Sequence, residues 1–531
     1  MFIREKKNKS GSVSIQLLSK DNGKNHLVKT IGCATERPEI DALKRQAQDV
    51  MDDLLNQSSL LTSDDEQQLI GSISMLNNRN IQTIGPELIF GSIYDEIGFN
   101  EVKDDLFRHL VLARLAFPLS KLKTVDYLRR YQGLDIKIDA VYRFLDRLES
   151  QHKSLIEQVA FKHTQRSQGG VISAVFYDMT TLHFETEDED DLRRTGFSKV
   201  GKHKHPQIYL GLLVGANGYP IGYDIFEGKT YEGHTLIPFM EAMSAKFDIG
   251  KPVVVADSGL LSAKNIHALE EQGYEYILGA RLKVESAHVK SKILEYAWED
   301  GSLRSFTKGA QRLVVHYSSK RAYRDSENRR KGLERLKQRV SSGQLTKQSL
   351  NNRGYNKYLK LHGEVKIEID MQKYEQDSVW DGLKGYITNT KLTEQELLNH
   401  YGQLWHIEKA FRMSKTDLRV RPIYHRLESR IRAHMSIVFT AYCIYKTLET
   451  ALKKEHSTLS LEQAAEVTQN MYQVVLELPG QQTQKILLGM DEQQQELLEI
   501  CKKHFRVTQR WTQEKNTSSS CGKLCSLFSC L

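Results

Sequence analysis

The sequence VISAVFYDMTTLHFE, residues 171–185, is an apolar, β-rich run with a single acid, Asp178, in its middle. Short runs with turn residues between them predict strands, whereas periodic runs of ten or more residues predict helices. After this first strand the chain continues with strands at 208–218 and 219–228 joined by the tight turn ANGYP, a helix at 234–247, a short buried strand at 251–259, a helix at 262–273 and a strand at 274–281.

This order of three strands, a helix, a strand, a helix and a strand favours a ribonuclease H-like α/β sheet. In such a sheet two acids lie on neighbouring central strands. Asp178 lies inside the first strand, and Asp257 ends the strand KPVVVADSG. We expect both carboxylates to be in buried surroundings, where an acid is costly unless it meets a partner or a cation. For Asp257 the alternative is that it caps the segment that follows.

The stretch YGQLWHIEKAFRMSKTDLRVRPIYH, residues 401–425, begins as an amphipathic helix, for which Thr393 is the expected N-cap. On one ideal continuous helix Tyr401, Glu408 and Lys415 would fall within an arc of about 40°. A solvated face beside a core stripe is the plain alternative. With Asp178 and Asp257, however, Glu408 completes a set of three carboxylates. Such a set can hold two Mg²⁺ or Mn²⁺ ions about 4 Å apart for phosphodiester chemistry.

The composition is that of a soluble globular protein of several domains, with 531 residues, 40% hydrophobic and 27% charged, and a net charge of +8. Residues 281–360 hold 20 Lys and Arg against seven Asp and Glu. This concentrated positive charge, with tyrosines among it, predicts a polyanionic partner, most commonly nucleic acid. Intrahelical ion pairs are the alternative for part of the segment. No signal-like segment follows Met1, so we expect a cytoplasmic, nucleoid-associated protein. We also expect reduced cysteines, and a buried helix at 435–445.

The N-terminal part predicts a β-hairpin over residues 1–35 and a helical region to residue 76. Residues 86–150 predict several short helices, which are compatible with a helix-turn-helix DNA reader but equally with a bundle that reads nothing. The basic residues available there are Lys121, Lys123, Arg129, Arg130 and Arg143.

Six blocks of the chain resemble bacterial insertion-sequence transposases of the DDE class, in the IS-four superfamily, and most closely its IS-sixteen-thirty-four branch. The likeness covers about residues 1 to 450. The blocks are FYDMTTLHFE, GFSKVGKHKHPQIYLGLLV, GYDIFEGKTYEGHTLIP, VVVADSGLLSAKNI, DGLKGYITNT and LWHIEKAFRMSKTDLRVRPIYHR.

The resemblance implies that Asp178, Asp257 and Glu408 hold two Mg²⁺ or Mn²⁺ ions as catalytic residues and metal ligands. It also implies that Tyr401 and Lys415 contact DNA phosphates near the cleaved bond. The implied activity is hydrolysis that frees a 3′-hydroxyl at each element end, followed by attack of that hydroxyl on target DNA. The implied partners are the terminal inverted repeats and target DNA, handled by a homodimer in a synaptic complex.

One position departs from the family's Tyr, Arg, Glu, Lys signature, because Leu404 stands where the Arg is expected. On a continuous helix Arg412 would project within roughly 20° of Tyr401. We therefore hypothesise that Arg412 supplies the missing cation and binds DNA phosphate.

These observations predict an α/β protein with a ribonuclease H-like catalytic core, a β-rich basic insertion, an N-terminal hairpin and helical DNA-binding region, and C-terminal helices. Two alternative functions stay open, an inactive copy that only binds DNA and a metal-dependent nuclease without strand transfer. The expected domains are 1–84 (hairpin and helical region), 85–165 (helical, candidate helix-turn-helix), 170–281 (core, first part), 282–380 (basic insertion), 381–455 (core, second part), 456–510 (C-terminal helices) and 511–531 (disordered tail).

Overall fold

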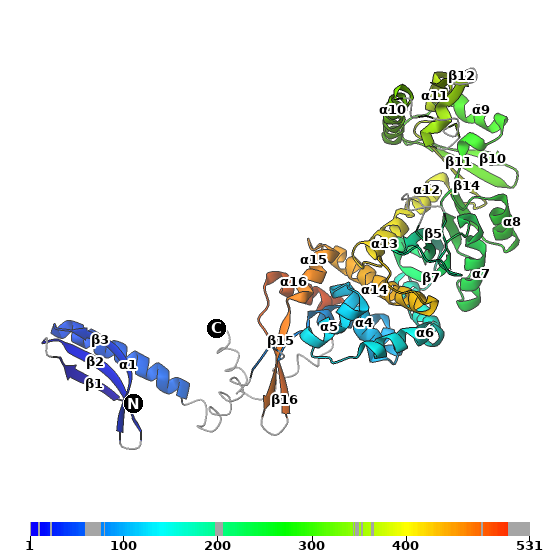
Figure 1. Cartoon of the computed structure of the whole chain (residues 1–531). Coiled ribbons are helices and arrows are strands. Elements are labelled where there is room, and N and C mark those ends of the chain that lie inside the picture. The colour runs from blue at the N-terminus through cyan, green and yellow to red at the C-terminus, as the bar shows by residue number, and fades with distance from the viewer. Residues whose placement is uncertain are drawn as a thin grey trace. The chain divides into compact units, whose positions relative to one another are not determined.

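The computed structural model describes residues 2–8, 11–21, 24–58, 76–78, 80–196, 205–342, 345, 350–351, 354–362, 366–478 and 482–507. The tail expected at 511–531 therefore lies outside the described residues. The chain forms two compact units (Figure 1). The first comprises residues 1–82 and 473–488, and the second comprises residues 83–472 and 489–531.

The first unit holds two small antiparallel sheets. In one of them β1 (Phe2–Lys7), β2 (Val13–Asp21) and β3 (Lys24–Ala34) pair in chain order, followed by α1 (Arg37–Ser58). The expected hairpin is thus β2 and β3, with β1 added at its edge. The other sheet has the order β16–β15–β4, from β16 (Gln482–Leu487), β15 (Tyr472–Leu478) and β4 (Ile81–Thr83).

The prediction of helices alone over 456–510 is wrong at this second sheet. Only α15 (Leu461–Gln469) and α16 (Glu492–His504) are helical there. The stretch YQVVLEL has the β-branched content and alternation of a strand, and Pro-Gly follows it, so the strand signal was present in the sequence.

An eight-stranded mixed sheet in the second unit carries the expected order of elements. Its strand order is β10–β11–β14–β9–β8–β5–β6–β7. The five strands predicted between 171 and 281 are confirmed. They are β5 (Ala174–His183), β6 (Gln207–Val214), β7 (Pro220–Glu227), β8 (Val253–Ala256) and β9 (Tyr276–Ala280). Strands β5, β6 and β7 are antiparallel, whereas β5, β8 and β9 are parallel, so the two strands that lead to Asp178 and Asp257 are direct neighbours.

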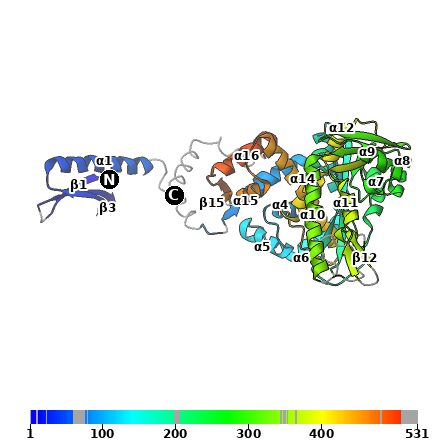
Figure 2. The same cartoon turned by 90° about the horizontal axis from the view of Figure 1, so that it is seen from above.

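Helices cover both faces of this sheet. The two expected crossover helices, α7 (Leu236–Lys246) and α8 (Ala263–Glu271), pack on the face that carries Tyr177 and Ala256. The opposite face, with Phe176 and Val255, packs against α13 (Trp405–Lys415) and α14 (Glu428–Lys454). Figures 1 and 2 both show α7 and α8 on one side of the sheet and α14 on the other. The alternation of side chains along β5 thus assigns Asp178 to the α13 face.

A helical region packs around α14. Helices α3 (Ser92–Ile97), α4 (Asp105–Ala116) and α6 (Ile138–Ser167) contact α14, and α5 (Lys121–Tyr131) packs on α4 and α6. The expected helices of 86–150 are present, although α6 is 30 residues long rather than short. The stretch 435–445 is a buried helical segment, as expected, inside α14. Among the described residues, none of the helices is long and apolar enough to cross a membrane.

The basic segment follows β9 and is mainly helical rather than β-rich, so that part of the prediction is wrong. Strands β10 (Leu303–Lys308) and β11 (Gln311–Tyr317) extend the main sheet next to β14 (Leu383–Thr388). The remaining described elements are α9 (Ala287–Glu295), α10 (Ser319–Ser341), the strand pair β12 (Leu359–His362) and β13 (Lys366–Ile369), and α11 (Met371–Ser378). The Arg, Lys, Glu and Leu residues of α10 are good helix formers, which explains the 23-residue helix.

Candidate active site

Asp178 and Asp257 lie at the same level of the sheet. Tyr177 on β5 is in register with Ala256, the last residue of β8, so Asp178 in β5 is level with Asp257 just after β8. Both aspartates belong to the α13 face because their neighbours Tyr177 and Ala256 pack on the other one. Asp178 is half-buried and its Oδ1 accepts a hydrogen bond of 2.7 Å from the backbone N–H of Met179.

Asp257 is exposed, so the expectation of a buried acid there is wrong. The strand β8 ends at Ala256, and the aspartate already belongs to the following turn. Its Oδ1 accepts a 3.2 Å hydrogen bond from the hydroxyl of Tyr401. Burial of Tyr401 and the negative charge of Asp257 both raise the pKa of this hydroxyl, which therefore stays protonated and donates.

The expected continuous helix from Thr393 onward is broken into two. Thr393 does cap α12 (Glu394–Gly402), through a capping box with Glu396, but α13 begins anew at Trp405. Across the break the backbone makes tighter bonds, such as that from Leu404 N–H to Tyr401 O. Gly402 at the end of α12 weakens the helix there by about 1 kcal/mol relative to alanine. The helical-wheel relation of Tyr401 to Glu408, Lys415 and Arg412 therefore does not hold, since the residues are on different helices.

The three carboxylates nevertheless meet at one cavity of about 280 Å³. Residues that line it come from β5, the end of β8, β14, α12 and α13; they are Asp178, Asp257, Lys384, Tyr386, Leu398, Tyr401, Gly402, Leu404, Trp405, Ile407 and Glu408. Glu408 is exposed at the first turn of α13, and its neighbour Ile407 is buried in the core. Among the described residues no three acids, histidines or cysteines lie close enough to hold one metal ion together.

The expected phosphate-binding residues lie at different places around this cavity. Lys415 donates from Nζ to the hydroxyl of Thr180, two residues after Asp178 on β5. Arg412 is exposed on α13 and does not line the cavity, whereas Leu404 does. Tyr401 is 5% exposed and its ring packs at a tilt of 59° against Tyr386, with ring centroids 4.6 Å apart.

Lys384 is a cation of the site that the sequence reasoning did not single out. It lies on β14 and lines the acid cavity. Its Nζ is 4.4 Å from the centroid of the Tyr401 ring. Burial and the nearby Arg321 lower its pKa, while Asp257 and Glu408 act in the opposite direction. The block DGLKGYITNT contains this lysine, but only the pairing of β14 with β9 places it beside the acids.

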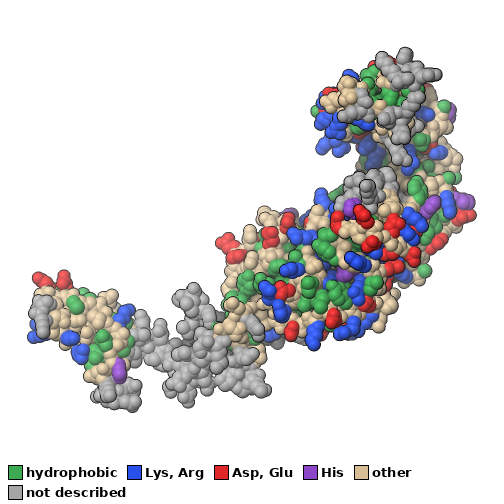
Figure 3. Space-filling view, viewed as in Figure 1, with side chains coloured by type: hydrophobic (Ala, Val, Ile, Leu, Met, Phe, Trp, Pro, Cys, Tyr) green, Lys and Arg blue, Asp and Glu red, His purple; other side chains and the backbone are tan. Residues whose placement is uncertain are grey.

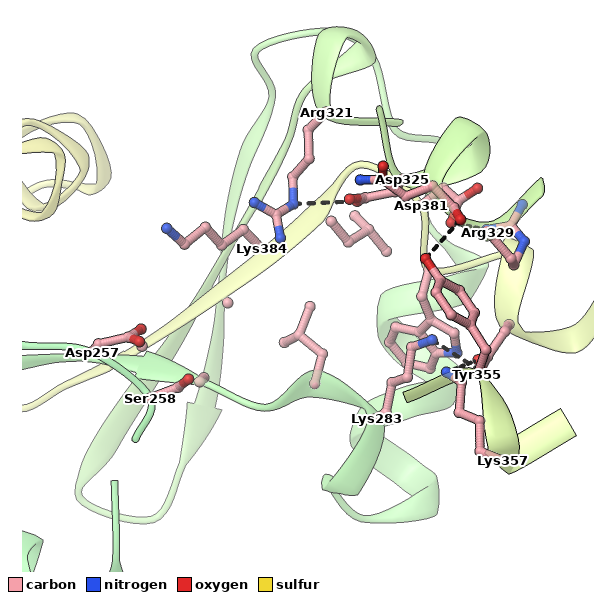
Figure 4. Close-up of a pocket in the computed structure, with 18 of the residues that line it drawn as sticks. Asp257, Ser258, Lys283, Arg321, Asp325, Arg329, Tyr355, Lys357, Asp381 and Lys384 are labelled. Atoms are coloured by element: carbon pink, nitrogen blue, oxygen red, sulfur yellow. Dashed lines mark hydrogen bonds and ion pairs between the residues drawn. The ribbon is translucent and has the colours of Figure 1, made fainter. Parts of the chain in front are cut away.

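A larger cavity of about 560 Å³ adjoins the site and reaches into the basic segment. Asp257, Lys384 and Tyr401 line both cavities. Figure 4 shows Asp257 and Ser258 on one side and side chains of the segment, including Arg321 and Lys283, on the other. Several cations here are paired, because Arg321 contacts Asp325 at 3.4 Å and Lys283 contacts Asp377 at 2.9 Å.

Residues 169–444 match the family model of the transposase DDE domain. This match spans just over half of the chain and contains Asp178, Asp257 and Glu408. The chain belongs to the DDE transposase family. No curated protein matches this family member. Among solved structures, the DDE family member is similar to the piggyBac transposase in a synaptic complex with hairpin DNA. That similarity has 10% sequence identity and a TM-score of 0.37, and covers 72% of this chain and 76% of the other.

Proposed function

We propose that this DDE family member is an insertion-element transposase that cuts the ends of its element and joins them to target DNA. The observation that carries the proposal is the convergence of Asp178, Asp257 and Glu408 on one cavity from three separate elements. Three carboxylates at one cavity suit phosphoryl transfer, which needs concentrated negative oxygen ligands for divalent ions. The strand order supports a ribonuclease H-like core.

The donor set fits Mg²⁺ or Mn²⁺, with two ions per site. All three carboxylates supply hard oxygen ligands, and two of them, Asp257 and Glu408, are exposed to an incoming ion. Magnesium commonly binds through one or two carboxylates together with water and substrate phosphates, so three protein ligands need not converge on one ion beforehand. When bound, such ions polarise the scissile phosphate and activate the attacking oxygen.

The chain's own groups then orient and bind the DNA. Tyr401 holds Asp257 through its hydroxyl, and Lys415 fixes α13 to β5 at Thr180. We assign to Tyr401, Lys415 and the exposed Arg412 the binding of phosphates near the cut. Arg412 acts there from the surface of α13, outside the acid cavity.

The helix α10 supports an extended DNA contact. Figure 3 shows Lys and Arg side chains gathered beside the region of α10. Some are paired, such as Arg330 with Glu327 and Glu334. Within the described part of the chain, six exposed cations of α10 have no carboxylate partner: Lys320, Arg324, Lys331, Arg335, Lys337 and Arg339. Such a row can neutralise successive phosphates.

The finer assignments are also proposals. We propose that the protein is bacterial and belongs to the IS-four superfamily and its IS-sixteen-thirty-four branch. We also propose that it is located at the nucleoid and binds the terminal inverted repeats and target DNA. A homodimer in the synaptic complex would handle two ends together. The helices within 85–165 are the proposed second DNA-binding region.

A joining assay separates the proposal from its two alternatives. Purified protein, Mg²⁺, labelled element ends and a target plasmid are incubated together. Joined products support the transposase. Cut ends without joining support a nuclease, and bound but intact DNA supports an inactive DNA-binding copy. The same assay with Asp178→Asn protein is the control for cutting by a contaminating enzyme.

A further inference from the structure

A second cavity of about 560 Å³ lies away from the acids, between the α4–α5 connection, α6 and the segment that follows α13. Its lining carries positive charge and imidazole groups from Arg114, Lys121, Lys123, Arg419, Arg421, His425 and His434. Among the described residues that line it, none is an aspartate or glutamate. A cavity whose charged lining residues are all cationic is unusual in a protein interior, where charges are normally paired.

Three of these side chains are almost completely buried. Arg114 is 6% exposed, Lys121 5% and His434 4%. Arg114 donates to the Leu119 carbonyl at 3.0 Å, but its Nε has no partner. His434 uses Nε2 for the Val420 carbonyl at 3.2 Å, and its Nδ1 has none. No described residue accepts a hydrogen bond from the Lys121 ammonium.

The nearby carboxylate is already occupied. Asp146 on α6 receives two hydrogen bonds, of 2.6 and 2.8 Å, from Arg430. Burial lowers the pKa of Arg114 to about 10, and burial with the Arg114 charge lowers that of Lys121. Burial, followed by the charge of Lys121, lowers the pKa of His425 to about 4. The native fold therefore holds this cluster at a cost that a bound anion would offset.

We propose that this cavity is a phosphate site that holds a backbone phosphate of DNA, separate from the acid cavity. The N-terminus of α5 opens into it, with Ser120 as the N-cap, and helix N-termini favour anions. The exposed Lys123, Arg419 and Arg421 at its rim would bind neighbouring phosphates of the same strand. This choice of DNA over a free anion rests on the proposed function.

The position of the site links it to the acids through the chain. Arg419 and Arg421 lie four and six residues after the end of α13, and Val420 and Ile423 between and after them are buried in the core. A phosphate held here would fix the segment that continues the helix of Glu408. The site thus positions the substrate strand relative to the acids, without touching the cleaved bond.

The first test uses Lys121→Met, which keeps the apolar stem and removes an unpaired charge. Binding of an element-end duplex is followed by fluorescence anisotropy in EDTA, so that nothing is cut. We expect binding about tenfold weaker or more. The slope of log affinity against log salt should fall by about one. Lys454→Met is the matched control, because it removes one exposed charge at the end of α14 and should leave affinity unchanged.

The second test uses inorganic phosphate as the probe and needs no DNA. Phosphate at about ten times its dissociation constant should raise the melting midpoint of the parent protein by roughly 3 °C over chloride of equal ionic strength. It should not raise that of Lys121→Met. The variant should melt no lower than the parent in chloride, which shows that it is folded.

Each outcome decides the proposal. Loss of both DNA affinity and the phosphate shift in Lys121→Met supports it. Loss of the phosphate shift in Lys121→Met with DNA affinity unchanged would mean a free-anion site and overturns the DNA assignment. Equal phosphate shifts in parent and variant overturn the site itself. Absence of DNA joining by a parent protein that still shows the phosphate effect would count against the proposed function alone.

Discussion

The hydroxyl of Tyr401 donates a hydrogen bond to Oδ1 of Asp257 across a distance of 3.2 Å, although 144 positions separate the two residues. This contact ties α12 to the end of β8. It also occupies one carboxylate oxygen of the acid cavity and leaves the other available to a ligand. Because the pKa of Tyr401 is raised by burial and by Asp257, the bond persists through the neutral pH range.

Removal of this hydroxyl should misorient Asp257 without unfolding the protein. Tyr401→Phe is expected to lower the rate of element-end cutting about tenfold, with an unchanged melting midpoint. Tyr386→Phe is the matched control, since the Tyr386 ring packs against Tyr401 and lines the same cavity. If the Tyr401→Phe protein cuts at the parental rate, the hydroxyl is not needed to orient Asp257.

The three acids should each be required for cutting but not for binding. Asp178→Asn, Asp257→Asn and Glu408→Gln are expected to lower cutting by at least about a thousandfold, because each removes a charged ligand of the proposed ions. Anisotropy with element ends in EDTA should show parental affinity. Glu462→Gln, an acid on α15 outside the acid cavity, is the control. Activity that survives any one substitution excludes that acid from the site.

Lys384 should compete with divalent ions for the acid cavity. Without its ammonium, Asp257 and Glu408 lose a neighbouring positive charge. Lys384→Met is therefore expected to bind Mn²⁺ about fivefold more tightly in the absence of DNA, which corresponds to about 1 kcal/mol of Coulomb interaction. Titration calorimetry checks this, and Lys454→Met serves as the charge control. Weaker Mn²⁺ binding in Lys384→Met would contradict the prediction.

Arg412 should contribute to DNA binding through a phosphate. Since it is exposed and does not line the acid cavity, Arg412→Ala should leave stability and Mn²⁺ affinity unchanged. The salt slope of element-end binding should fall by about one, with a uniform loss of affinity for all sequences. A variant that binds and cuts element ends as well as the parent would refute the hypothesis that Arg412 replaces the expected arginine at Leu404.

Glu449 should make the packing of α13 on α14 sensitive to acid. Its side chain is 7% exposed and contacts Lys409 of α13, together with Lys446 at 2.7 Å and Lys453 at 3.1 Å. Although burial alone would raise its pKa, these lysines lower it from 4.5 to about 2. Because the pKa of Glu449 is lower in the folded than in the unfolded protein, its carboxylate stabilises the fold at pH values above the unfolded pKa. This stabilisation is lost as the pH falls from about 5 toward 2.

We therefore expect the parent to lose about 2 kcal/mol more stability than Glu449→Gln between pH 6 and pH 3. Urea unfolding at the two pH values measures this difference. At pH 6 the variant should be less stable than the parent by about 2 to 4 kcal/mol, because three lysines lose their carboxylate. Equal acid sensitivity of parent and variant would show that Glu449 does not carry the effect.

Local sequence pattern predicted the central sheet and its nearby helices well. The five strands between 171 and 281, the helices between them, the cap at Thr393 and the buried helix at 435–445 follow from hydrophobic period and turn residues, which act over a few positions. Two of the wrong predictions concern helices. The helix predicted to be continuous from Tyr401 to Lys415 ends at Gly402, and YQVVLEL, with its strand-like alternation, forms β15 where only helices were predicted.

The sequence by itself determined which residue types stand on which elements, including the acids Asp178, Asp257 and Glu408. Only the tertiary structure decided which of them meet. Parallel pairing of β5 with β8 brings two of the acids to one level, and the packing of α13 on that face adds the third. Lys384 reaches them through the pairing of β14 with β9, and Arg114, Lys121 and His434 form their cavity across more than 300 positions of sequence. Such contacts depend on how whole elements pack, and the pattern of neighbouring residues carries no information about them.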